Sequence, residues 1–216
     1  IDATAFDDSS GNSFSGISSK TALSFTTADV EAPTLSSSSP ADNATSVGVD
    51  SNIILTFSEA VDRESGNIYI YKSSDDTEVE RISVTSDNVT GTGTNVITIN
   101  PSSDLESSTQ YYVKIDDTAF DDSSDNSFSG ISSKTALSFT TADVEAPTLS
   151  SSSPADNATA VGVDSNIELT FSEAVDREIG NIYIYKSSDD TEVERISVTS
   201  ENVTGTGTNV ITIDPS

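Results

Sequence analysis

The sequence predicts an all-β chain made of tandem β-sandwich repeats, and two observations lead to this prediction. First, the chain repeats itself: residues 1–102 can be laid on residues 115–216, and only 7 of these 102 pairs differ. The period is therefore 114 residues, which suits one autonomous domain and is too long for a solenoid unit. Second, short runs of alternating β-branched and aromatic residues recur within each repeat, separated by Gly, Ser, Asp and Asn clusters, as in a sandwich.

The repeats meet at a short segment that occurs twice, at residues 26–34 and 140–148. We therefore expect one complete repeat over residues 30–143, preceded by the C-terminal part of another repeat (1–29) and followed by the N-terminal part of a third (144–216). Neither partial repeat contains a copy of residues 103–114. Two explanations stay open: the segment belongs to a longer ordered chain, or neighbouring chains complete its partial domains by strand addition.

Seven strands are expected in the complete repeat, and no stretch has the 3.6-residue period of a helix. They are residues 34–38 (resuming near 47–49 after Pro40), 52–58, 67–72, 78–84, 95–100, 110–115 and 136–141. Alternation points Ile53, Leu55 and Phe57 into the core. Ile54 should point outward, because the second copy carries Glu168 there and Glu is almost never buried unpaired. Seven short strands predict an immunoglobulin-like sandwich, in which Tyr111 or Tyr112 either forms a tyrosine corner or is an ordinary packed tyrosine.

Composition excludes several functions. The chain holds 36 Asp and Glu against 9 Lys and Arg, a net charge of -27, which argues against nucleic acid and anionic membranes as partners. It has no Cys and no His, so Cys–His and Ser–His–Asp catalysis and thiolate or histidine zinc sites are excluded. No apolar run is long enough to span a membrane. We expect a protein that is not an enzyme.

Several segments of the complete repeat together resemble one known family, the bacterial SbsA-type Ig-like domain. These segments are Ala32–Thr34, Ser39–Thr45, Val47–Val49, Asn52–Val61, Tyr111–Ile115, Asp125–Phe128 and Ser138–Thr141. The resemblance covers the whole complete repeat. It implies tandem modules of large secreted or cell-surface bacterial proteins, including surface-layer and adhesin-like proteins. It does not imply one activity, because a fold does not determine a function.

Acidic residues concentrate in three segments that an Ig-like sandwich gathers at one end: the incoming linker, the B–C loop and the F–G loop. Carboxylates are among the ligands that calcium prefers, so the sequence predicts an interdomain calcium site; the alternative is that these acidic loops are only solvated. The candidate ligands are Asp29, Glu31, Glu59, Asp62, Asp116, Asp117 and Asp121, with Asp143, Glu145, Glu173 and Asp176 at the next junction. Glu64, Asp122 and Asp125 lie in the same loops. No EF-hand loop is present.

Three functional hypotheses follow. The first is a stalk or spacer of a large extracellular adhesin, with calcium stiffening the joints and neighbouring repeats as its partners. The second is a subunit of a self-assembling filament, sheath or surface layer, whose partial domains are completed by neighbouring chains. The third is a carbohydrate- or protein-binding module. This last hypothesis requires an exposed aromatic cluster, for which only Tyr69, Tyr71 and Tyr112 are candidates, and no recognition patch is evident from the sequence alone.

Overall fold

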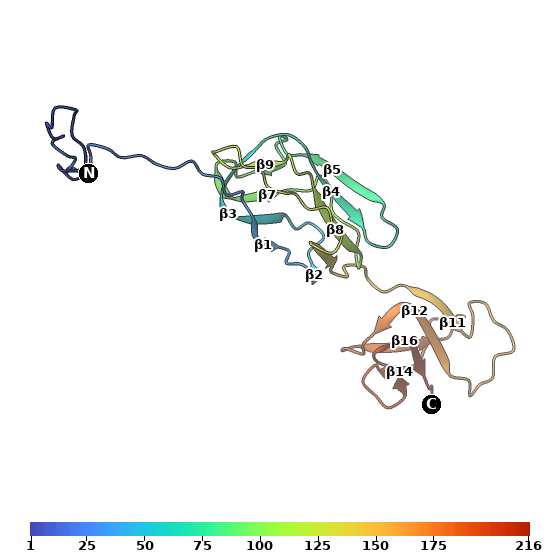
Figure 1. Ribbon diagram of the computed structural model, residues 1–216. Coiled ribbons are helices and arrows are strands. Elements are labelled where there is room, and N and C mark those ends of the chain that lie inside the picture. Colours follow the sequence, from blue (N-terminus) through green and yellow to red (C-terminus); the bar gives the residue numbers. More distant parts are fainter. The chain divides into compact units, whose positions relative to one another are not determined.

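A computed structural model describes residues 1–216, which form two compact units, Ile1–Asp143 and Val144–Ser216. The chain contains sixteen strands, ten of them in the complete repeat, where seven were expected. It contains no helix, as expected, and Figure 1 shows strands only. None of its elements is therefore a helix that could cross a membrane. The complete repeat lies within the first unit, and each unit is described by itself below.

The first sheet of the complete repeat is antiparallel throughout and has the order β1-β3-β7-β6. Its strands are β1 (Leu35–Ser39), β3 (Ile53–Arg63), β7 (Thr94–Ile99) and β6 (Val89–Thr90). A short fifth strand, β9 (Phe120–Asp121), pairs with the C-terminal end of β3. This pairing brings the loop after β9 to the end of the sandwich where the chain enters.

The second sheet has the order β2-β10-β8-β4-β5. Its strands are β2 (Ala44–Val47), β10 (Ser138–Thr141), β8 (Gln110–Ile115), β4 (Asn67–Lys72) and β5 (Glu78–Ser83). All pairs are antiparallel except β2 with β10, which is parallel. The expected first strand is thus two strands in different sheets. Its second half lies at 44–47 rather than 47–49, because these are the residues that pair with β10.

The core lies between the two sheets. Ile53, Leu55 and Phe57 are fully buried, whereas Ile54 between them is only half-buried. Tyr111 is fully buried and its hydroxyl accepts a hydrogen bond from the backbone N–H of Glu106 at 2.9 Å, so Tyr111 and not Tyr112 forms the tyrosine corner.

Residues 1–29 form no strand, and their only ladder contact is an isolated bridge between Asp7 and Ser13. Five of their large apolar side chains are exposed, whereas the five equivalent side chains of the complete repeat are buried. Phe25 is 86% exposed and its equivalent Phe139 is 2% exposed. The difference arises because Phe139 packs with the β3, β4 and β8 side chains of its own repeat.

The second unit repeats the first half of the sandwich. One sheet has the order β11-β12-β16-β15 and the other pairs β13 with β14. The strands are β11 (Leu149–Ser153), β12 (Ile167–Val175), β13 (Asn181–Tyr185), β14 (Glu192–Ser197), β15 (Val203–Thr204) and β16 (Thr208–Ile213). Residues 158–161, equivalent to β2, form no strand, because the counterpart of β10 is not among these residues.

Candidate metal centre

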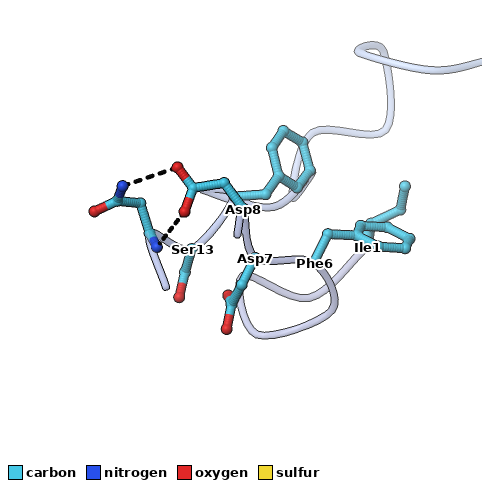
Figure 2. Close-up of a pocket in the computed structure, with 7 residues that line it drawn as sticks. Ile1, Phe6, Asp7, Asp8 and Ser13 are labelled. Carbon is cyan, nitrogen blue, oxygen red and sulfur yellow. Dashed lines mark hydrogen bonds between the residues drawn. The ribbon is translucent and has the colours of Figure 1, made fainter. Parts of the chain in front are cut away.

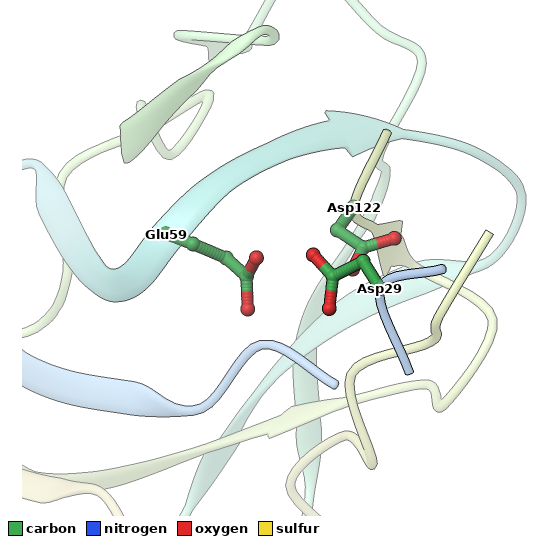
Figure 3. Close-up of side chains that lie close together, drawn as sticks. All are labelled: Asp29, Glu59 and Asp122. Carbon is green, nitrogen blue, oxygen red and sulfur yellow. The ribbon is translucent and has the colours of Figure 1, made fainter. Parts of the chain in front are cut away.

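Three carboxylates from three segments converge where the chain enters the complete repeat. They are Asp29 of the linker, Glu59 of β3 and Asp122 of the loop that follows β9, and one oxygen from each lies within 4.8 Å of the others. Figure 3 shows the Glu59 side chain extending from its strand toward the other two carboxylates. The site is therefore assembled from residues that are 30 and 63 positions apart in the sequence.

Asp122 accepts the most hydrogen bonds of the three carboxylates. The residue is only 4% exposed, and its Oδ1 accepts hydrogen bonds from the backbone N–H groups of Ser124 (2.7 Å) and Asn126 (2.9 Å). The Asn126 side chain donates to Oδ2 at 2.8 Å. These hydrogen bonds, that of the Asn126 side chain foremost, hold the pKa of Asp122 below its ordinary value. The residue is thus ionised and fixed in orientation.

The turn in which Asn126 donates to the Asp122 carboxylate has an equivalent in residues 1–29, which form no sandwich. There the Asp8 carboxylate accepts hydrogen bonds from the backbone N–H of Asn12 at 2.8 Å and from its side chain, also at 2.8 Å, as Figure 2 shows. The pKa of Asp8 is lowered for the same reason, with the Asn12 side chain as the largest cause. The turn is therefore encoded locally, by an Asp and an Asn four residues apart.

Asn126 also connects this turn to the linker. Its side-chain amide donates to the main-chain oxygen of Asp29 at 3.4 Å, a long hydrogen bond. The Asp29 carboxylate in turn accepts the backbone N–H of Glu31 at 3.1 Å, which orients it within the linker. Between Asp29 and the loop after β9, this long hydrogen bond is the one hydrogen bond beside the three carboxylates.

Glu59 is the member of the cluster whose pKa is raised. Its partial burial raises its pKa, and the Asp29, Asp122 and Glu31 carboxylates raise the pKa further, in that order. No lysine or arginine forms an ion pair with Asp29, Glu59 or Asp122. Like charges at this separation repel one another unless a proton or a cation lies between them.

The geometry suits a calcium ion. Calcium binds six to eight oxygens at about 2.3–2.6 Å, so two oxygens on opposite sides of one ion are about 4.8 Å apart. The three carboxylates can supply three or more of these oxygens, because a carboxylate binds through one oxygen or both. Water would complete the shell, since Asp29 is exposed and Glu59 half-buried.

The structure separates this cluster from several residues that the sequence grouped with it. Asp62 and Asp121 are paired across β3 and β9. Asp62 follows the buried Val61, so alternation turns it toward the outer face, whereas the Asp121 Oδ1 atom is buried without a hydrogen-bond partner. Asp62 Oδ1 accepts the hydroxyl of Thr92 at 3.0 Å. Neither belongs to the cluster.

Asp116 and Asp117 also lie elsewhere, directly after β8. The Asp116 carboxylate accepts the backbone N–H of Asn67 at 2.9 Å and the hydroxyl of Tyr69 at 3.3 Å, so it holds β4 against β8. Asp117 is exposed. Of the residues predicted in this region, Asp29 and Glu59 belong to the cluster and Glu31 lies near enough to raise the pKa of Glu59.

Asp122 was not among the predicted ligands, although it is the most buried member of the cluster. Continuing the alternation from the buried Phe120 would have pointed Asp122 inward. The Asp and Asn spacing that recurs at Asp8 and Asn12 was a second signal.

At the next junction, the structure places the predicted residues without completing a cluster. Asp143 accepts the hydroxyl of Ser107 at 3.2 Å, and Asp176 accepts that of Thr206 at 3.0 Å. Glu145 is exposed and Glu173 half-buried on β12. The position equivalent to Asp122 is not among residues 144–216.

A family model described as "Bacterial Ig-like domain" matches residues 29–141 and 143–216. The chain belongs to this family. Both matches begin close to the linker acids Asp29 and Asp143. In this Ig-like chain, each match therefore starts at the linker and not at the first strand. A search of the curated proteins returned no match.

Two solved structures are similar to this Ig-like chain. The crystal structure of the S-layer protein rSbsC(31-844) is 14% identical with a TM-score of 0.35, and the match covers 82% of this chain and 25% of that one. The N-terminal part of the bacterial S-layer protein SbsC is 15% identical with a TM-score of 0.35, and the match covers 84% of this chain and 43% of that one. The chain thus spans less than half the length of either.

Proposed function

We propose that this chain is a stalk or spacer segment of a large extracellular bacterial surface protein, and that calcium stiffens the joint at the start of each repeat. The observation that supports the proposal most directly is the convergence of Asp29, Glu59 and Asp122 beside a linker that makes only one long hydrogen bond to the loop after β9. An ion held by all three would fasten the linker to two separate segments of the sandwich.

The site would join the last residue of the preceding segment, Asp29, to the complete repeat, and all three of its carboxylates belong to the first unit. Without an ion, the repulsion among the three carboxylates opposes seating of Asp29. With an ion, the same charges hold the linker in place. Calcium would thereby restrict the direction in which each repeat leaves its predecessor, which is what a stiff stalk requires.

The remaining features agree with a spacer. Tandem copies that differ at 7 of 102 positions supply length rather than different activities. Pro33 restricts the backbone immediately after the linker, and it is buried. The net charge of -27 keeps a long array soluble and self-repelling. The partners of each repeat along the stalk are neighbouring copies of the same repeat. We expect the chain to have no catalytic activity.

Small-angle X-ray scattering and calorimetry of this chain, with calcium and with chelator, test the proposal. We expect calcium to raise the melting temperature of the complete repeat and to narrow the distribution of particle dimensions. Glu59→Gln should weaken both effects, and Asp62→Asn, which changes a carboxylate outside the cluster, should leave them intact. Equal melting and equal scattering with calcium and chelator would refute the calcium joint.

A further inference from the structure

The outer face of the second sheet carries the aromatic cluster that a binding module requires. The register pairs Tyr69 with Lys114 and Tyr71 with Tyr112 across β4 and β8, so these four side chains form a square on one face. The Tyr69 and Tyr71 ring centroids are 6.1 Å apart and those of Tyr71 and Tyr112 are 5.1 Å apart. Tyr112 is buried, and Tyr69 and Tyr71 remain half-exposed.

Lys114 has a different environment from the other cations of the complete repeat. Lys72, Arg81 and Lys134 each form an ion pair with a carboxylate, and the Arg63 guanidinium donates to main-chain oxygens. Lys114 forms no ion pair. Its Nζ lies 5.5 Å from the Tyr71 ring centroid and 5.7 Å from that of Tyr112, which leaves its N–H donors available to a ligand.

A groove of about 430 Å³ lies beside this square. The exposed parts of Tyr69 and Tyr71 form its aromatic side, with the Arg81 guanidinium 5.2 Å from the Tyr69 ring centroid. Its polar lining includes Lys114, Asp117 and Ser129 together with Ser132. The volume is within the range of small-molecule sites, which combine apolar walls with a few polar groups. The Asp116 carboxylate, also in the lining, is engaged with Asn67 and Tyr69.

These groups match the chemistry of a pyranose ring. Such a ring has apolar C–H faces that pack on aromatic carbons, and hydroxyl groups that both donate and accept hydrogen bonds. Lys114 supplies donors, the exposed Asp117 carboxylate supplies acceptors, and the serine hydroxyls supply both. We propose that this groove binds a neutral sugar unit of a glycan, with Tyr69 and Tyr71 as the packing surface and Lys114 and Asp117 as hydrogen-bonding partners.

A neutral sugar suits the groove better than an acidic one. The chain carries a net charge of -27, and two carboxylates, Asp116 and Asp117, lie in the groove itself. An anionic polymer would be repelled by this field at low ionic strength. Binding of a glycan by successive near-identical repeats would add avidity to weak single contacts, and it is independent of the calcium joint.

A glycan array that holds neutral and acidic glycans, probed with the labelled chain, tests the proposal. NMR titration with the neutral glycans that bind locates the contact. We expect retention of neutral glycans, and shifts of the Tyr69, Tyr71 and Lys114 signals. Failure of all neutral glycans to bind, or binding of acidic glycans only, would overturn the proposal.

Two variants and one matched control make the test specific. Lys114→Met keeps an aliphatic chain over the rings and removes the N–H donors, and Asp117→Ala introduces the residue that stands at the equivalent position, Ala3. Each should weaken binding about tenfold with an unchanged melting temperature. Tyr183→Ala changes the equivalent of Tyr69 in the second unit, where no counterpart of Lys114 is present, and should leave binding unchanged. Wild-type affinity in both groove variants would refute the assignment.

Discussion

The calcium joint makes a quantitative prediction about stability. An ion that binds only the folded repeat stabilises it by about 2.7 kcal/mol when its free concentration is 100 times the dissociation constant. Unfolding entropy is about 2.1 cal/mol/K per residue, so a repeat of 114 residues has about 0.24 kcal/mol/K and its melting temperature rises about 4 °C for each kcal/mol. Saturating calcium should therefore raise the melting temperature of the complete repeat by about 11 °C relative to chelator.

The change in melting temperature that Glu59→Gln causes should differ in direction between chelator and calcium. In chelator, the substitution removes a charge that is repelled by Asp29 and Asp122, so the melting temperature should rise or stay constant. In calcium, it removes a ligand, so the melting temperature should fall. Scanning calorimetry of wild type, Glu59→Gln and the control Asp62→Asn measures all of these effects. A Glu59→Gln variant that is equally destabilised with calcium and with chelator would show that Glu59 has a packing role only.

The contribution of Glu59 to the stability of the calcium-free protein should change with pH in one direction. Because the folded pKa of Glu59 is raised, the stability that its proton contributes is complete below the unfolded pKa and is lost as pH rises through the folded value. The difference in stability between wild type and Glu59→Gln isolates this effect from the many other carboxylates. We expect wild type to lose stability relative to the variant as pH rises through that window.

Three further predictions concern the sandwich and the loop after β9. Tyr111→Phe should lower the free energy of unfolding in urea by about 1 kcal/mol, because the backbone N–H of Glu106 loses its acceptor. Tyr112→Phe should lower it less, because the Tyr112 hydroxyl donates to the exposed Asp76. Leu55→Ala should lower the free energy of unfolding by about 3 kcal/mol in the same assay, because the Leu55 side chain is fully buried. Ile54→Glu introduces the residue that the second copy carries and should lower it by under about 1 kcal/mol. Equal losses would contradict the assigned faces. Asp122 has a lowered pKa, so its stabilising effect is present above the unfolded pKa and is lost as pH falls through the folded value; Asp122→Asn should flatten this acid loss in a urea-unfolding series.

Much of the fold was predictable because it depends on period-two alternation. The inward assignment of Ile53, Leu55 and Phe57 needed only the residues themselves and the Glu168 substitution. The strands that were not predicted, β6 and β9, have two residues each, too few to show any period. The division of the first predicted strand between two sheets depends on β10, which lies almost a hundred residues away.

The candidate site was predictable in part. The sequence indicates that acids cluster at the linker and in two loops, and Asp29 and Glu59 do meet. It did not separate Asp122 from Asp121, because adjacent residues differ only in the face to which the strand turns them. The Tyr69 and Lys114 groove was likewise not evident, since its walls come from β4 and β8 and become neighbours only through strand pairing.

By itself, the sequence determined the repeat, the all-β class and the turn that orients Asp122. The turn forms even at Asp8 and Asn12, outside any sandwich, because all of its hydrogen bonds lie within five residues. Tertiary structure alone decided which carboxylates converge and whether a strand forms at all. Residues 44–47 are a strand and the near-identical residues 158–161 are not, because a β-strand obtains its backbone hydrogen bonds from another segment of the chain and is stable only where that segment is present.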